Sequence, residues 1–172
     1  MRKVVIIVIF SLILNASAQV TLGAGQDKNE EYQQRMSLYK KVETVANVPW
    51  YVLAAVDQYE RNVRHSRKDI PKAEGLIEIY VKPEVWAGPL NPNLSDNNPL
   101  SIGLFGGIGV DGNGDGLANQ KDDEDILFTF ANYLMSYGSD VDNLKIGLWD
   151  YYQRDKAVGL IIGHMKLYKN YE

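Results

Sequence analysis

Apolar residues recur at helical spacing over most of the chain, and this pattern predicts a mainly α fold. The spacing predicts helices over 29–48, 49–67, 123–137 and 155–171, with one more between the last two. Val48-Pro49 separates the first two helices, because a residue before proline avoids the helical region while proline suits a first helical turn. Asp140 or Asp142 can cap the additional helix, and Gly138 ends the helix before it.

The stretch from 69 to 102 interrupts the helical pattern and contains every proline except Pro49. Within it, the β-prone residues LIEIYV, 76–81, predict one short strand, and the remainder is predicted to be an ordered loop. So long a loop inside a compact domain is usually functional or covers a core.

The N-terminus has the pattern of a signal peptide. Arg2 and Lys3 precede an apolar run, 4–14, and small residues follow at 16–18. This predicts a signal peptide over 1–18, a flexible leader over 19–28 and one folded domain over 29–172. The apolar run is short for a bilayer span, so we expect a secreted or wall-located protein with no stable membrane span after cleavage. An uncleaved anchor is the alternative.

Composition narrows the classes of function. The chain has 172 residues, 45% of them hydrophobic, which suits one compact domain. It has no cysteine, so an exported form would be stabilised by its core or by a bound ion rather than by disulfides. Its formal charge of -4 and the lack of a basic stripe argue against a nucleic-acid partner.

The stretch DGNGDGLANQKDDED, residues 111–125, matches the calcium-loop pattern D-x-[DN]-x-[DN]-G-x5-E except at its last acid. The predicted Ca²⁺ ligands are Asp111, Asn113, Asp115, the carbonyl of Leu117 and Asp122. Alternate side chains turn inward around a hard cation, and Gly116 permits the sharp reversal. Glu124 or Asp125 is an alternative last ligand, because Asp122 is one methylene shorter than glutamate. We predict a structural calcium ion; a solvated acidic turn is the other interpretation.

A carboxylate stands out on the second predicted helix. At 100° per residue, Glu60 lies inside the apolar arc, between Val56 and Leu53. Asp57, Arg61 and Arg64 lie on the polar side of the same helical wheel. Desolvation would raise the pKa of Glu60 and suit it to general acid catalysis. The alternative is a boundary glutamate paired with one of the two arginines.

Three segments carry a resemblance to a known family. VPWYVLAAVDQYE, residues 48–60, resembles the catalytic-helix segment of soluble lytic transglycosylases, whose folds are similar to goose-type lysozyme. The family pattern P-x-x-L-L-A-x-I-x-x-x-E ends in the catalytic acid, here Glu60. GLFGG, 103–107, resembles the family's active-site turn, and 111–134 is similar to a "DGNGDG…A…YL" segment that contains Tyr133. The resemblance covers about residues 40 to 155.

This resemblance implies a lysozyme-like helical fold and cleavage of the bond between N-acetylmuramic acid and N-acetylglucosamine in peptidoglycan. Glu60 would protonate the leaving oxygen and then, as a base, assist closure of a 1,6-anhydro sugar. Tyr133, Phe105 and Gly103 would bind substrate. Trp86 and Tyr80 are candidate sugar platforms, and Asp57 is not a convincing second carboxylate. The acidic loop would fix two walls of the groove.

The chain departs from the family at two places. Arg61 stands where serine usually follows the catalytic glutamate, and Phe105-Gly106 replaces a methionine-glutamine pair. QYERNVR, WAGPLNPN, FGGIGVDGNGDG and LWDYYQRDKAV also resemble the N-terminal, lysozyme-like region of exported lysostaphin-type endopeptidases, in which a zinc peptidase domain follows. The chain has two histidines, His65 and His164, and no H-x-H motif.

Three interpretations follow. The first is a lytic transglycosylase acting on peptidoglycan glycan strands. The second is a catalytically degenerate wall-binding module of, or partner to, a peptidoglycan endopeptidase whose peptidase domain is lost or separately encoded. The third is a calcium-dependent adhesin, which accounts for the acidic loop but not for Glu60.

Overall fold

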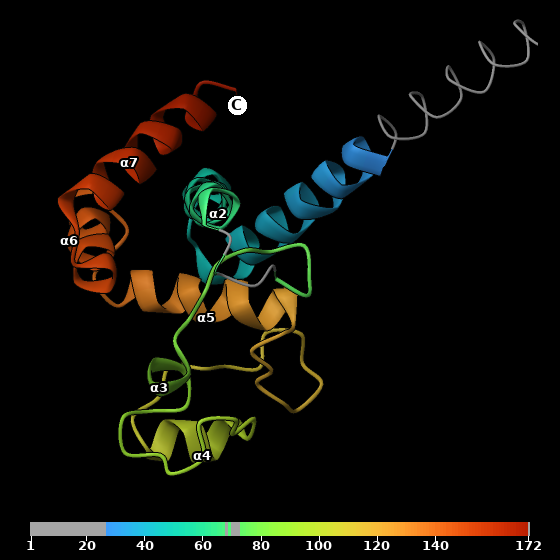
Figure 1. Ribbon diagram of the computed structural model, residues 1–172, viewed down its shortest axis with the longest axis vertical. Helices are drawn as coiled ribbons and strands as arrows, with labels where there is room; N and C mark the ends of the chain where they lie inside the picture. The colour runs from blue at the N-terminus through green and yellow to red at the C-terminus, as the bar shows by residue number, and fades with distance from the viewer. Residues whose placement is uncertain (1–26, 68, 70–72, 172) are drawn as a thin grey trace, which may run out of the picture. The chain divides into compact units, whose positions relative to one another are not determined.

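The computed structural model describes residues 27–67, 69 and 73–171, and helices dominate this part of the chain (Figure 1). The chain forms two compact units, Met1–Gln34 and Arg35–Glu172. In the first unit, residues 27–34 are helical. In the second, residues 35–46 are helical and are followed by α2 (Trp50–Ser66), α3 (Pro83–Trp86), α4 (Pro99–Leu104), α5 (Asp123–Met135), α6 (Val141–Tyr152) and α7 (Asp155–Lys169). The predicted mainly α class is therefore confirmed.

The N-terminal predictions fall largely outside the described residues. The proposed signal peptide, 1–18, lies there, as does the predicted leader, 19–28, apart from its last two residues, which are helical. Among the helices of the described part, none combines the length and the apolar composition needed to cross a membrane.

Helix boundaries follow the capping signals closely. The helical run that precedes Pro49 along the chain ends at residue 46. Asn47 then takes a left-handed conformation with φ 56°. Pro49 is then the N-cap residue of α2. The side chain of Asp122 caps α5 and that of Asp140 caps α6, each by accepting two backbone amides. Asp140 is thus the cap of α6, and Asp142 lies in its first turn.

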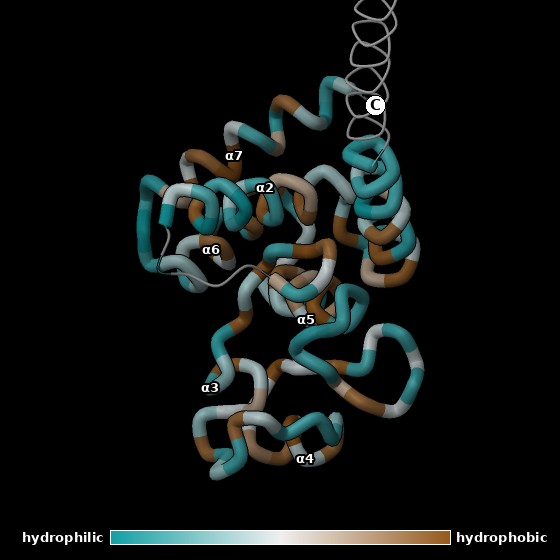
Figure 2. Tube along the Cα trace, turned by 45° about the vertical axis from the view of Figure 1, so that its right-hand side comes forward, coloured by the Kyte–Doolittle hydropathy of each residue, from teal (hydrophilic) through white to brown (hydrophobic). Residues whose placement is uncertain are grey.

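The core lies where the longer helices meet. α2 packs against α7, α7 against α6, and α6 against α5. Figure 2 shows hydrophobic residues concentrated on the facing sides of α2, α5 and α6. The largest fully buried side chains of these helices are Leu53, Val52, Leu127, Phe130, Leu134, Leu148 and Ile161. Burying each such side chain contributes about 1.5–3 kcal/mol, so this cluster is the main source of stability in a chain without disulfides.

The strand predicted over 76–81 is wrong, and the described residues contain no β-strand. The backbone amides of this segment are bound by side chains instead of by a neighbouring strand. The Asp123 carboxylate accepts hydrogen bonds from Leu76 and Ile77, both at 3.0 Å. The next amide along the chain donates to Asp57. Two helices therefore fix the segment through carboxylates, and β propensity alone could not reveal this.

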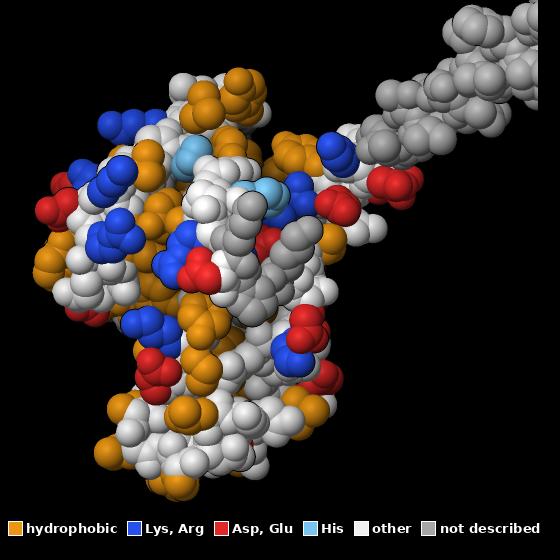
Figure 3. Space-filling view, in the orientation of Figure 1, with side chains coloured by type: hydrophobic (Ala, Val, Ile, Leu, Met, Phe, Trp, Pro, Cys, Tyr) orange, Lys and Arg blue, Asp and Glu red, His pale blue; other side chains and the backbone are white. Residues whose placement is uncertain are grey.

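Residues 83–122 form a lobe that contains α3, α4 and the acidic loop (Figure 1). Side chains in this lobe accept hydrogen bonds from nearby backbone amides and so hold its turns. The side chain of Asn98, for example, accepts hydrogen bonds from the amides of Leu100 and Ser101. Figure 3 shows hydrophobic side chains on the surface of this lobe. Five leucines there are exposed: Leu90, Leu94, Leu100, Leu104 and Leu117. The lobe therefore contributes less to the core than the long helices do.

Candidate active site

An open cleft of about 500 Å³ lies beside α2 in the second unit. Its lining residues are Tyr59, Glu60, Val63, Tyr80, Lys82, Val85, Tyr133, Asp150, Tyr151, Tyr152, Gln153 and Arg154. Sites for small molecules usually measure about 300–1,000 Å³, so this cleft is large enough for a sugar ligand. Glu60, Tyr80 and Tyr133, which the sequence singled out separately, meet in this one cleft.

Glu60 is a half-buried carboxyl group in the cleft wall. Its Oε1 accepts a 2.8 Å hydrogen bond from the hydroxyl of Tyr152. Burial raises the pKa of Glu60 to about 7, while the hydrogen bond from Tyr152 and the charge of Arg64 act in the opposite direction. A carboxyl group with such a pKa holds its proton near neutral pH and can donate it to a bound ligand.

The two arginines near Glu60 on α2 form ion pairs with other acids. Arg61 contacts Asp57 at 2.9 Å, and Arg64 contacts Glu78 at 2.9 Å. The interpretation in which Glu60 is a boundary glutamate paired with one of these arginines stays an alternative, because the charge of Arg64 lowers the pKa of Glu60. Glu60 itself lines the cleft.

Asp57 was expected on the polar side of α2, and this expectation is wrong. Its side chain is buried, with 1% relative exposure. It accepts hydrogen bonds from the hydroxyl of Tyr39 at 2.7 Å, from Arg61 at 2.9 Å and from the backbone amide of Glu78. The helical wheel could not anticipate this, because the groups that cover Asp57 come from elsewhere in the chain. Asp57 does not line the cleft and acts as a structural anchor.

A chain of tyrosine rings forms much of the cleft, and the sequence analysis missed most of it. Tyr59 packs edge-on against Tyr152, with ring centroids 5.2 Å apart, and Tyr152 packs against Tyr151 at 5.1 Å. Tyr151 in turn packs against Tyr133 at 5.3 Å. The signal was present as the pair Tyr151-Tyr152 at the end of a predicted helix, but spacing alone does not distinguish a cleft wall from core packing.

The hydroxyl groups of these tyrosines are held by specific acceptors. Tyr151 donates to the carbonyl of Tyr80 at 2.6 Å, and Tyr133 donates to the carbonyl of Gly147 at 3.1 Å. Burial raises the pKa of both Tyr151 and Tyr133 above the ordinary range, so each stays a protonated donor. Fixed rings with satisfied hydroxyls make this wall of the cleft rigid.

Other predicted substrate-binding residues lie elsewhere. Gly103 is within α4 and is exposed, and Phe105 is the C-cap residue of that helix. Neither lines the cleft. Trp86 is fully buried and lines a smaller pocket, so it is not a platform in the cleft. The structure therefore brings Tyr80 and Tyr133 to Glu60 but does not bring Gly103, Phe105 or Trp86.

The acidic loop is organised by hydrogen bonds within itself. Asp111 accepts hydrogen bonds from the amides of Gly114 at 2.7 Å and Gly116 at 2.8 Å. Asp115 accepts one from the amide of Leu117 at 2.8 Å. Gly114 and Gly116 have φ values of 83° and 93°, which glycine adopts without strain. Backbone amides therefore offset part of the repulsion among these carboxylates.

The loop meets only part of the requirement for a calcium site. Asp111, Asn113 and Asp115 stand close enough for hydrogen bonds to link them through the loop backbone. The predicted last ligand, Asp122, instead accepts the amides of Glu124 and Asp125 at the start of α5. Within the described residues, no three His, Cys, Asp or Glu side chains come together in a way that could hold a metal ion. Calcium binding stays a prediction.

The described residues thus form a helical domain with an aromatic cleft around Glu60, a glutamate whose pKa is raised to about 7 by burial. No family model matches the chain, and no solved structure matches it. One relative is the L-Ala–D-Glu endopeptidase of Bacillus subtilis (strain 168), which is 59% identical over 138 residues. The match covers 80% of this chain but 42% of that protein, so the chain spans less than half of its relative's length.

Proposed function

We propose that this chain is an exported domain that binds peptidoglycan glycan strands and serves a peptidoglycan endopeptidase, as its wall-binding module or as its partner. The main support is the 59% identity over 138 residues with an L-Ala–D-Glu endopeptidase. An L-Ala–D-Glu bond occurs in the stem peptides of peptidoglycan, so an enzyme that cuts this bond works at the cell wall. The residues matched make up 42% of that enzyme, which fits one region of a larger protein.

The cleft suits a glycan strand. Its tyrosine rings present flat apolar faces that can stack on the C–H faces of pyranose rings, with polar hydroxyls close by. Tyr80 is 51% exposed and is free to contact a ligand with its ring. Lys82 and Arg154 add positive charge to the lining, which favours a polymer whose peptide branches carry carboxylates.

Co-sedimentation with purified sacculi tests this proposal. We expect the protein to sediment with sacculi, and Tyr80→Ala to weaken binding about tenfold, the loss expected for about 1.4 kcal/mol of contact. Tyr171→Ala is the matched control, because Tyr171 is also an exposed tyrosine but does not line the cleft. Equal binding by the wild type and both variants, or no binding at all, would contradict the proposal.

A second candidate function is lytic transglycosylase activity, and one observation favours it. The pKa of Glu60, raised to about 7 by burial, is the property a general acid requires. Glu60 would protonate the glycosidic oxygen as the bond between N-acetylmuramic acid and N-acetylglucosamine breaks. The resulting carboxylate would then remove the proton of the muramoyl 6-hydroxyl while that oxygen bonds to C1, forming the 1,6-anhydro sugar and restoring the acid.

Product analysis separates the two candidates. A transglycosylase would release anhydro-muropeptides from sacculi, and Glu60→Gln would reduce the rate by about 10²–10⁴-fold, the usual contribution of a general acid. The same variant would still bind sacculi. Binding without any soluble anhydro product, by the wild type as well as by the variant, would leave the wall-binding module as the function.

We also propose that the acidic loop binds a structural calcium ion. The support is the spacing of Asp111, Asn113 and Asp115, together with the sharp reversal at Gly116. Asp122 or Glu124 would have to turn toward the loop to supply the remaining ligand. Asp125 already faces the loop, because its carboxylate accepts hydrogen bonds from the amides of Gly112, Asn113 and Asn119. The ion would neutralise charge in the loop, and it has no part in the chemistry proposed for Glu60.

A further inference from the structure

A second, smaller pocket lies beside the cleft. It measures about 200 Å³ and has an apolar floor that includes Ile79, Trp86 and Ile126. Small-molecule sites usually exceed about 300 Å³, so this pocket is too small for a whole ligand and suits a branch of a ligand that is bound next to it.

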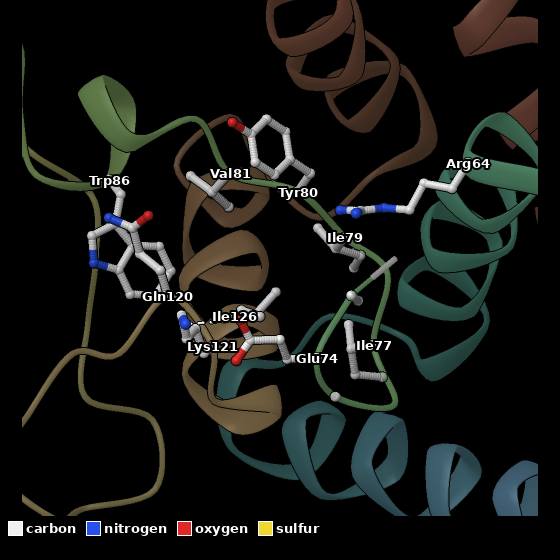
Figure 4. A pocket seen from close by; sticks show the side chains of 12 residues that line it. Arg64, Glu74, Ile77, Ile79, Tyr80, Val81, Trp86, Gln120, Lys121 and Ile126 are labelled. Carbon is white, nitrogen blue, oxygen red and sulfur yellow. Dashed lines mark hydrogen bonds and ion pairs between the residues drawn. The ribbon is translucent and has the colours of Figure 1, made fainter. Parts of the chain in front are cut away.

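The rim of the side pocket is charged. Lys121 and Glu74 form a 2.8 Å ion pair at this rim, with side chains 66% and 68% exposed. Figure 4 shows this pair on one side of the pocket and Arg64 with Tyr80 on another. An exposed ion pair contributes little to stability, so Lys121 can exchange Glu74 for a ligand carboxylate at small cost.

Tyr80 connects the side pocket to the cleft, because it lines both. Its carbonyl accepts the hydroxyl of Tyr151 at 2.6 Å, and the guanidinium of Arg64 lies 5.7 Å from the centre of its ring. Tyr80 is therefore a fixed partition between two neighbouring cavities. A ligand with a branch could lie in the cleft and extend its branch past this ring.

We propose that the side pocket receives the peptide branch of a muropeptide whose sugar lies in the cleft. This inference rests on the proposed function, since it takes peptidoglycan as the ligand. The first residues of such a branch combine small apolar groups with a carboxylate. The apolar floor around Ile79 and Trp86 matches the former, and Lys121 on the rim matches the latter. The pocket thereby distinguishes peptide-bearing strands from bare glycan.

The test compares two ligands by calorimetry, with Glu60→Gln as the parent protein so that neither ligand is cleaved. One ligand is the disaccharide of N-acetylglucosamine and N-acetylmuramic acid, and the other is the same disaccharide with L-Ala-D-Glu on its lactyl group. We expect the parent to bind the peptide-bearing ligand at least about tenfold more tightly, the ratio we define as the peptide increment.

Two rim variants then form a matched pair. Adding Lys121→Ala should reduce the peptide increment to about threefold or less, because the cation that meets the carboxylate is lost. Adding Glu74→Ala, at the other end of the same ion pair, should maintain or increase it, because Lys121 is released. Lys145→Ala, which removes a lysine paired with Asp142 away from both pockets, should change nothing.

Equal affinity of the parent for both ligands would overturn this inference while leaving glycan binding intact. Equal weakening by Lys121→Ala and Glu74→Ala would also overturn it, because a general loss of rim structure would then explain the result. Failure of the parent to bind the bare disaccharide, together with failure to bind sacculi, would overturn the proposed function and this inference with it.

Discussion

The cleft and the acidic loop use carboxylates in opposite ways. In the cleft, Glu60 is half-buried with one hydrogen bond from Tyr152, and burial raises its pKa to about 7. In the loop, Asp111 and Asp115 lie near the surface and accept several backbone amides. The loop has the higher density of acidic residues. The single acid among apolar neighbours has the more unusual chemistry, because solvent and amides do not stabilise its charge.

Asp57 is a third carboxylate, and it differs from Glu60 although both are at least half-buried. Asp57 lies one helical turn before Glu60 and is as buried as any core residue, yet it accepts hydrogen bonds from Tyr39, Arg61 and the Glu78 amide. Its two carboxylate oxygens accept hydrogen bonds from these three partners, whereas the one hydrogen bond described at Glu60 comes from Tyr152. Partners, rather than burial alone, therefore decide whether a carboxylate anchors the fold or is available for chemistry.

The largest expected effect is the loss of stability caused by replacing Asp57, the structural anchor on α2. Asp57→Ala would leave the Tyr39 hydroxyl, the Arg61 guanidinium and a backbone amide without their acceptor in a buried site. We expect a loss of about 3–5 kcal/mol in the free energy of unfolding, measured by urea denaturation. Lys145→Ala serves as a surface control. A loss below 1 kcal/mol would show that Asp57 is not the anchor described here.

The next effect concerns the pH dependence of stability. Because the pKa of Glu60 is about 7 in the folded protein and 4.5 without the fold, the unfolded chain releases its proton first as pH rises. Stability should therefore fall between about pH 4.5 and 7, by about 3–4 kcal/mol in total, and then level off. Urea unfolding across this range measures the fall, and Glu60→Gln should remove it. The same dependence of stability on pH in the wild type and in Glu60→Gln would contradict a raised pKa for Glu60.

Calcium should have a smaller effect, confined to the loop. For a site with a dissociation constant of about 10⁻³ M, 10 mM Ca²⁺ would stabilise the protein by about 1–1.5 kcal/mol. Differential scanning fluorimetry with calcium and with a chelator measures the shift in Tm, and Asp115→Ala should abolish it. If the Tm of the wild type does not respond to either addition, the amide hydrogen bonds alone organise the loop.

The smallest effect tests the hydrogen bond at Glu60. The hydroxyl of Tyr152 lowers the pKa of Glu60 in opposition to burial, so Tyr152→Phe should raise that pKa further. The pH interval in which stability falls would then extend upward, with a change of about 1 kcal/mol in stability. Tyr151→Phe is the control, since its hydroxyl donates to the Tyr80 carbonyl instead. Matching shifts in both variants would argue against a specific role for Tyr152.

The sequence predicted the helices well and the tertiary contacts poorly. Periodicity located the start of α5 at Asp123 and the start of α7 near Asp155, and it offered Asp140 and Asp142 as caps of α6, of which the structure uses Asp140. These features depend on residues close together in the chain, which a local pattern contains. The position of Glu60 in an apolar arc was likewise a property of one helix, and the structure places it in a cleft.

The remaining features depend on residues far apart in sequence. The acceptors that replace strand pairing at 76–78 come from α2 and α5, and no local pattern reveals them. Tyr151 and Tyr152 became cleft residues because α6 ends there, where Gln153 takes a left-handed conformation with φ 50°. Gly103 and Phe105 were assigned to the site from a turn motif, but that motif lies in the lobe of α3 and α4.

The attachment of residues 76–78 by Asp57 and Asp123 has a consequence for how this chain avoids self-association. LIEIYV is a β-prone and largely apolar segment, the kind that pairs with copies of itself when its amides are free. In the folded protein, carboxylates occupy the amides of its first three residues, so that end offers no template to a second chain. Protection therefore arises only once α2 and α5 have formed. Loss of either aspartate would promote aggregation as well as unfolding.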